Sequence, residues 1–200
     1  MYDILVKPCG EYATNCYIVK HELGDIVIDP GKGALEFIKA KSKKVVAILN
    51  THGHYDHIWD NKLVANEFQA PIYTPKDDIF MLEDDGSGYL SSNDISIAVG
   101  DKEELVFNGL KFTFHHFAGH TPGCSIIEFD NLYFSGDFLF ERSIGRWDFE
   151  FSNADDMVKS LEKAKSLKDD FYLLPGHGNQ TKVSLEKPHF DSWIRYIKQC

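Results

Sequence analysis

The first fifty residues alternate short runs of β-forming side chains with turn residues. These runs lie at residues 4–6, 15–19 and 25–28. Such runs predict antiparallel strands, and the third ends at a turn, Asp29-Pro30-Gly31. Apolar residues spaced as on one helix face predict a short helix over 34–40. The nearly continuous apolar run at 45–49 is typical of a strand buried on both faces.

The remainder of the chain continues the same alternation. Two turns, Asn108-Gly109 and Asp130-Asn131, separate β-forming runs and predict two hairpins. Helices are expected over 61–68, from a cap at Ser152 or Asn153 through 164, and over 188–197. Further strands are expected at 71–73 and 171–174, and an exposed loop at 83–92. No repeat or linker interrupts the pattern, so a single domain over residues 1–200 is expected.

Composition narrows the class of protein. The chain has 200 residues, of which 43% are hydrophobic and 26% charged, in the range of a globular domain. Its apolar stretches fall short of the roughly 20 residues that span a bilayer, so no membrane association is expected. Asp and Glu number 31 against 21 Lys and Arg, a net charge of −10 that disfavours nucleic acid as a partner.

The start of the chain and its cysteines favour a cytoplasmic location. Residues 1–8 lack the basic start, apolar run and small-residue cleavage site of a secretory signal. The four cysteines form no C-x-x-C pair and are too few for a disulfide scaffold. We interpret them as buried or incidental thiols in a reducing compartment.

The strongest chemical signal follows the apolar run that ends at Leu49. The segment Thr51-His52-Gly53-His54-Tyr55-Asp56-His57 places four metal-binding side chains within six positions. The i, i+2 spacing suits a loop leaving a strand end, where alternate side chains converge. A polar surface loop that happens to be rich in histidine is the alternative.

Three later residues share the context of a strand end next to glycine. They are His120, Asp137 and His177. A lone histidine is more often structural than a ligand, but the repeated context favours ligation here. Five histidines and two aspartates are enough to hold two metal ions.

The ordered set resembles the metallo-β-lactamase superfamily, which is marked by T-H-x-H-x-D-H followed by a later His, Asp and His. The resemblance spans nearly the whole chain and implies an α/β fold, a four-layer αββα sandwich with the metals at one end. By this resemblance His52, His54 and His120 bind one metal, and Asp56, His57 and His177 bind the other. Asp137 would bridge them. Zinc is the first expectation, with iron or manganese also compatible with His and carboxylate ligands.

Within that superfamily, three motifs resemble the short bacterial type II glyoxalases, which hydrolyse hydroxyacyl thioesters. The motifs are Gly119-His120-Thr121-Pro122-Gly123, Ser135-Gly136-Asp137 and Gly145-Arg146-Trp147-Asp148-Phe149. The chain ends at Cys200 without the basic C-terminal segment with which longer glyoxalases hold glutathione. Arg146 is the cation near the motifs that could meet a substrate carboxylate, and a salt bridge with Asp148 is the alternative. Trp59, Phe138 and Trp147 are expected to form an apolar wall beside the acyl group, with core packing as the alternative.

The expected reaction is hydrolysis of a small thioester by a metal-activated hydroxide that Asp56 orients. A thiolate leaves without prior protonation, which agrees with the lack of a dedicated general acid. A persulfide dioxygenase with one iron, and a non-catalytic metal-binding module, are the alternatives. An exported β-lactamase and a metal-dependent nuclease are disfavoured by the absent signal and the negative charge.

Overall fold

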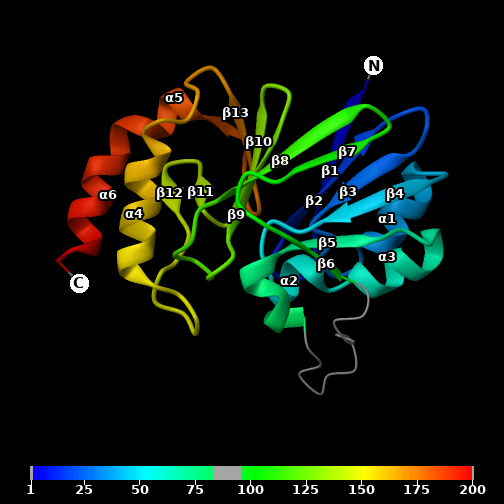
Figure 1. The fold of residues 1–200 in the computed structure, drawn as a ribbon, viewed down its shortest axis with the longest axis horizontal. Helices are drawn as coiled ribbons and strands as arrows, with labels where there is room; N and C mark the ends of the chain where they lie inside the picture. The colour runs from blue at the N-terminus through cyan, green and yellow to red at the C-terminus, as the bar shows by residue number, and fades with distance from the viewer. Residues whose placement is uncertain (1, 83–95, 200) are drawn as a thin grey trace.

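The computed structural model describes residues 2–82 and 96–199, and Figure 1 traces them. The first sheet has the order β1 (Asp3–Cys9), β2 (Thr14–Lys20), β3 (Asp25–Ile28), β4 (Val45–Leu49), β5 (Ile72–Pro75) and β6 (Ser96–Val99). The second has the order β14 (Thr181–Lys182), β13 (Tyr172–Pro175), β10 (Leu132–Gly136), β9 (Ser125–Phe129), β8 (Leu110–His116) and β7 (Glu104–Phe107). A separate hairpin pairs β11 (Leu139–Phe140) with β12 (Ser143–Ile144).

The helices cover the outer faces of the two sheets. They are α1 (Ala34–Lys41), α2 (Tyr55–Ile58), α3 (Asn61–Phe68), α4 (Ala154–Ala164), α5 (Val183–Glu186) and α6 (Phe190–Ile197), with 3₁₀ turns η1 (Lys76–Leu82) and η3 (Lys187–His189). In Figure 1, α4 and α6 lie on the left and α1 and α3 on the lower right, with the strands between them. None of the helices in the described ranges is long and apolar enough to cross a membrane.

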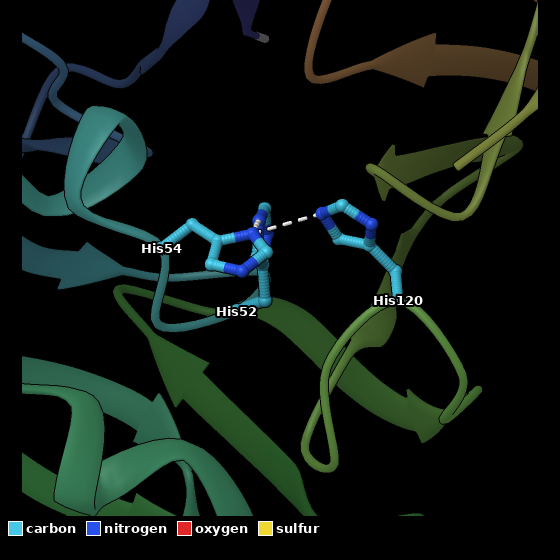
Figure 2. Close-up of side chains that lie close together, drawn as sticks. All are labelled: His52, His54 and His120. Carbon is cyan, nitrogen blue, oxygen red and sulfur yellow. Dashed lines mark hydrogen bonds between the residues drawn. The ribbon is translucent and has the colours of Figure 1, made fainter. Parts of the chain in front are cut away.

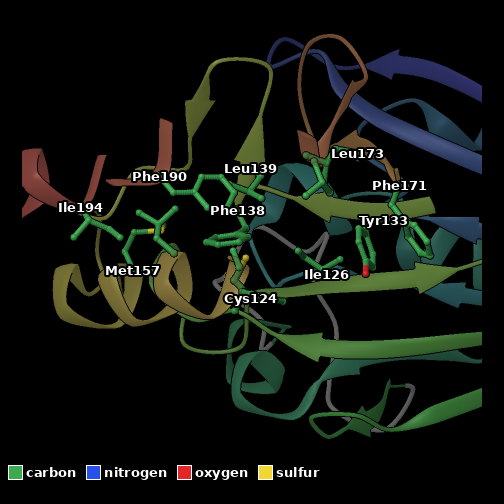
Figure 3. Packing of buried hydrophobic residues seen from close by; sticks show 14 of the residues in the cluster. Cys124, Ile126, Tyr133, Phe138, Leu139, Met157, Phe171, Leu173, Phe190 and Ile194 are labelled. Carbon is green, nitrogen blue, oxygen red and sulfur yellow. The ribbon is translucent and has the colours of Figure 1, made fainter. Parts of the chain in front are cut away.

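Strand alternation separates the interior into three apolar clusters, one for each contact between layers. On β2, Tyr17 and Val19 contribute to the cluster between the two sheets, whereas Cys16 and Ile18 contribute to the cluster under α1 and α3. The third cluster packs α4 and α6 on the second sheet, and Figure 3 shows Met157 from α4 among its members. The layers are therefore helix, sheet, sheet and helix, which confirms the predicted αββα sandwich.

Most predicted elements are found within one or two residues of their expected bounds. The antiparallel pairs β1–β2 and β2–β3, both predicted hairpins and the Asn153 cap of α4 are present. The segment predicted as one helix over 188–197 divides into η3 and α6. The sequence did not predict α2, α5, η1 or the short edge strands, because pieces of two to seven residues carry too little periodicity.

Two sequence expectations concern a loop and the cysteines. The loop expected at 83–92 and Cys200 lie outside the described residues. Cys9, Cys16 and Cys124 are free and buried, as expected for a chain without a disulfide scaffold.

The strand directions determine where the connecting loops meet. β3 and β4 are parallel, as are β10 and β13, while β8 runs antiparallel to β9, which runs antiparallel to β10. The segments that follow β8, β10 and β13 therefore leave the second sheet at the same edge. They face the loop after β4, and this edge holds the predicted ligands.

Candidate metal centre

All seven predicted ligands lie together at this edge, although they are spread over 126 positions from residue 52 to residue 177. His52 and His54 are on the loop after β4, and Asp56 and His57 are on α2. The other three, His120, Asp137 and His177, follow β8, β10 and β13. Loops can present polar groups in this way because the packed sheets fix their ends.

His52, His54 and His120 form one group of donor atoms, shown in Figure 2. The Nδ1 atom of His54 lies 3.2 Å from Nε2 of His52 and 2.9 Å from Nε2 of His120. A tetrahedral site with metal–nitrogen bonds of about 2.0–2.1 Å separates neighbouring ligand atoms by about 3.3–3.4 Å. The three nitrogens are therefore close to the spacing that such a site needs.

Asp56, His57 and His177 form a second group, and Asp137 lies between the two. Nε2 of His177 is 3.3 Å from Oδ2 of Asp56 and 3.4 Å from Oδ2 of Asp137. Asp137 also faces the first group, since its Oδ2 lies 3.5 Å from Nε2 of His120. Its position is that of a carboxylate able to contact cations in both groups.

The hydrogen bonds around the cluster test whether these residues suit metal ions. His120 and His177 each direct the outer nitrogen, Nδ1, at a backbone carbonyl, of Arg146 at 2.8 Å and of Tyr12 at 2.9 Å. That bond makes Nδ1 the donor and leaves Nε2 available to a metal. Oδ1 of Asp137 is buried without a hydrogen-bond partner, a cost that a cation would remove. The residues fit divalent metals.

The charges in the cluster are unequal. Burial lowers the pKa of His54, and nearby His120 lowers it further, to about 4. Burial also opposes the charged forms of Asp56 and His177, but several contacts together outweigh it. His177, His57 and Thr14 stabilise the Asp56 carboxylate, and Asp137 and Asp56 stabilise the charged form of His177. The pKa of Asp56 falls to about 2, and that of His177, which also bonds Asp137, rises to about 9. At neutral pH the first group therefore offers an uncharged histidine at His54, and the second group contains an ion pair.

Asp29 forms hydrogen bonds that reach a histidine of each group, directly to His57 and through Thr51 to His52. Its role was not identified from the sequence. Its buried carboxylate accepts hydrogen bonds from the backbone N–H of Thr51 at 2.8 Å and the Thr51 hydroxyl at 2.6 Å. Its Oδ2 also lies 3.0 Å from Nδ1 of His57, and Thr51 Oγ1 lies 3.1 Å from Nδ1 of His52. The sequence signal was an acidic residue at the end of a buried strand, which we interpreted only as part of a turn.

A second supporting carboxylate, Asp78, was also missed. It lies on η1 and accepts hydrogen bonds from the loops that carry His54 and His120. Nothing in the local pattern of residues 76–82 distinguishes it from Asp77, which is exposed, because its partners are 25 to 45 positions away.

A cavity of about 480 Å³ opens onto the cluster. Besides five of the candidate ligands, it is lined by Tyr12, Tyr55, Met81, Phe149, Glu150 and Phe151. The expected wall of Trp59, Phe138 and Trp147 is wrong, since none of the three lines it. Phe138 is fully buried in the core and Trp147 packs against Tyr196. The aromatic residues at the cavity come instead from the loop after β1, the start of α2 and the segment before α4.

Arg146 takes part in the salt bridge considered from the sequence. Its guanidinium donates to both carboxylate oxygens of Asp148, at 2.8 and 2.5 Å, and lies 4.5 Å from the centre of the Phe149 ring. It is not among the cavity-lining residues, and no Lys or Arg of the described ranges lines the cavity. The backbone carbonyl of Arg146, rather than its charge, reaches the cluster through His120.

Comparison with known proteins agrees with the fold and the clustered residues. The family model described as the metallo-β-lactamase superfamily matches residues 9–177. The chain belongs to the metallo-β-lactamase superfamily. A probable metallo-hydrolase of Streptococcus pyogenes is 33% identical over 94% of this chain and 87% of its own length. Hydroxyacylglutathione hydrolase GloC of Haemophilus influenzae is 29% identical over 92% of this chain and 95% of its own.

Solved structures with the same architecture include two that cover most of this chain. The BLEG-1 B3 metallo-β-lactamase superposes with a TM-score of 0.83 at 26% identity, covering 94% of this chain and 97% of that one. TTHA1623, solved in a di-iron-bound form, has a TM-score of 0.77 at 26% identity, covering 91% and 96%. This member of the superfamily is a metal-dependent hydrolase, and its clustered His and Asp residues could hold the metals.

Proposed function

We propose that this protein hydrolyses small hydroxyacyl thioesters and that two divalent metal ions, with zinc the first candidate, assist the reaction. His52, His54 and His120 would hold one ion, and Asp56, His57 and His177 the other. Asp137 would contact both. The observation that carries the proposal is that the two donor groups meet at the buried Asp137 carboxylate: its Oδ2 lies 3.5 Å from His120 and 3.4 Å from His177, and its Oδ1 has no hydrogen-bond partner.

The bound ions would supply hydroxide near neutral pH and polarise the thioester carbonyl, without a strongly basic side chain. The side chains of the protein contribute by fixing the charge and the orientation of Asp56. Asp56 is ionised at neutral pH, and the Thr14 hydroxyl donates to its Oδ2 at 2.7 Å, which fixes the orientation of the carboxylate. Its oxygens can therefore accept a hydrogen bond from a water molecule beside the second group and align it for attack.

The cavity favours a substrate recognised through its acyl group. The aromatic rings of Tyr12, Tyr55, Phe149 and Phe151 provide apolar surface next to the candidate ligands. No Lys or Arg from the described ranges lines this surface, and the 83–95 sequence contains neither residue. The carboxylates of a glutathione moiety would thus gain little there, so we propose weak discrimination among thiol carriers. Of the curated relatives, GloC is named for a hydroxyacylglutathione substrate, which makes glutathione thioesters the first compounds to test.

Metal analysis combined with a free-thiol assay tests this proposal. We expect two metals per chain and thiol release from hydroxyacyl thioesters in the wild type. His54→Ala and Asp137→Ala should lose thiol release and at least one metal while keeping the fold, since both residues lie on loops. His21→Ala is the matched control, because His21 lies at the opposite end of β2 and β3 and should change neither readout.

Two outcomes would contradict the proposal. One iron per chain, with oxygen consumption on persulfides and no thiol release, would identify the dioxygenase alternative. A metal-loaded protein inactive on every thioester and persulfide would support a non-catalytic metal-binding module.

A further inference from the structure

Asp78 joins two loops that are far apart in the sequence. Its side chain is fully buried on η1, and three donors converge on it. Oδ2 accepts from the backbone N–H of Gly53 at 2.9 Å and from the Thr121 hydroxyl at 2.6 Å, while Oδ1 accepts from the N–H of Gly123 at 2.6 Å. Burial raises the pKa of this carboxyl, and the three donors oppose that shift because they stabilise the carboxylate.

Each of these donors is next to a candidate ligand or in the same tight loop. Gly53 lies between His52 and His54, and Thr121 directly follows His120. One carboxylate therefore links the loop after β4 to the loop after β8. His54 Nδ1 and His120 Nε2, which project from these loops, lie 2.9 Å apart.

The contact also requires that the backbones approach closely. A Cβ atom at Gly53 would lie 2.8 Å from Cβ of Met81 and 3.0 Å from the carbonyl oxygen of Asp78. At Gly123 it would lie 2.7 Å from Cγ of Asp78. The separations of 2.8 Å at Gly53 and 2.7 Å at Gly123 are shorter than side-chain atoms normally tolerate, so only glycine allows η1 to pack this closely against both loops.

We propose that Asp78 is a positioning residue that sets the spacing of His52, His54 and His120 before a cation binds. This inference rests on the proposed metal centre but not on the identity of the substrate. A cation entering a preformed group does not have to order the loops, so the carboxylate raises affinity without contacting the ion. Within the described residues, the hydrogen bonds to the Asp78 carboxylate come from the loops after β4 and β8 and none comes from the loop after β13, so we expect its effect mainly in the three-histidine group.

Two substitutions separate positioning from general destabilisation. Asp78→Asn keeps the shape of the side chain, but in either amide orientation an NH₂ group faces a former donor. Thr121→Val removes a single hydrogen bond, and Thr121→Ser retains the hydroxyl. The matched control is Thr181→Val, because the Thr181 hydroxyl donates to the buried carboxylate of Glu186, also at 2.6 Å, in segments without candidate ligands.

The measurement is the zinc dissociation constant, obtained by competition with a chelator. Each substitution is made in two backgrounds: His177→Ala, which keeps the three-histidine group, and His54→Ala, which keeps Asp56, His57 and His177. We expect Asp78→Asn and Thr121→Val to weaken binding about 10- to 100-fold in the first background and less than about threefold in the second. Thr121→Ser should restore most of the affinity, and Thr181→Val should leave both constants near the parent value.

Unchanged affinity in the His177→Ala background would overturn the proposal. Equal losses in both backgrounds, or an equal loss with Thr181→Val, would also overturn it, because they would indicate general destabilisation. If Asp78→Asn does not fold, Thr121→Val decides. Selective loss in a protein that hydrolyses no thioester would leave this inference standing while the proposed substrate fails.

Discussion

Replacement of Asp29 by asparagine is the sharpest test of how the fold supports the metal centre. Asp29 adopts a φ of 50°, a left-handed conformation that asparagine tolerates better than most residues. Asp29→Asn therefore changes the hydrogen bonding with little change in backbone or volume. Alanine would add backbone strain at the same position and confuse the result.

The structure gives the size of the effect. If the amide NH₂ occupies the place of Oδ2, it faces the Thr51 hydroxyl and Nδ1 of His57. If it occupies the place of Oδ1, it faces the N–H of Thr51. The second orientation leaves one buried donor unpaired, which costs about 1–3 kcal/mol of unfolding free energy. Loss of the charged acceptor should also weaken metal binding about 10- to 100-fold, equivalent to about 1.4–2.8 kcal/mol.

Denaturant unfolding of the metal-free protein and zinc competition measure the two effects separately. Asp25→Asn is the matched control, because Asp25 is buried at the other end of β3 and accepts from the backbone N–H of His21, away from the ligands. The control should lose stability without losing metal affinity. Wild-type zinc affinity in Asp29→Asn, or an equal loss in Asp25→Asn, would refute the reasoning.

Three further predictions concern the reaction and the charges of the site. Asp56→Asn should lower kcat more than it raises KM in steady-state kinetics, since Asp56 is assigned to the attacking water and a metal rather than to substrate; retained kcat and metal content with raised KM would contradict this role. For one acyl group, kcat/KM on glutathione should exceed that on a minimal thiol by less than about a hundredfold, or roughly 2.7 kcal/mol, and Arg146→Ala should change kcat/KM little even for acidic substrates, because its guanidinium pairs with Asp148 and does not line the cavity. A larger preference would reveal a glutathione site. Zinc binding at pH 7 should release about two protons, measured by calorimetry in buffers of different ionisation enthalpy, because the pKa of His177 is raised to about 9 and nearby carboxylates raise that of buried His57. The apparent affinity for zinc should therefore increase from pH 7 toward pH 9. Release of less than one proton would show that His57 and His177 are not both protonated in the metal-free protein at pH 7.

The sequence by itself determined most of the longer helices and strands and the ligand candidates. Continuous apolar runs such as 45–49 identify strands covered on both faces, and turn pairs such as Asn108-Gly109 fix hairpins through local backbone preference. The segment 51–57 identified four candidates and the repeated occurrence of His or Asp beside glycine at strand ends identified the other three, because a loop after a strand is where an open α/β architecture presents ligands. Each of these signals depends only on residues that are close together in the sequence, so no knowledge of the tertiary structure is needed to detect it.

Only the tertiary structure decided which residues support the site and which line the cavity. Asp29 and Asp78 are recognised by donors that lie 22 to 45 positions away, and no local pattern records such partners. The same limit explains the error over Trp147, which lies within a motif but packs on α6, while Tyr12 reaches the cavity from the first hairpin. Which face a side chain takes in a loop depends on packing between distant segments, and that information exists only once the two sheets have come together.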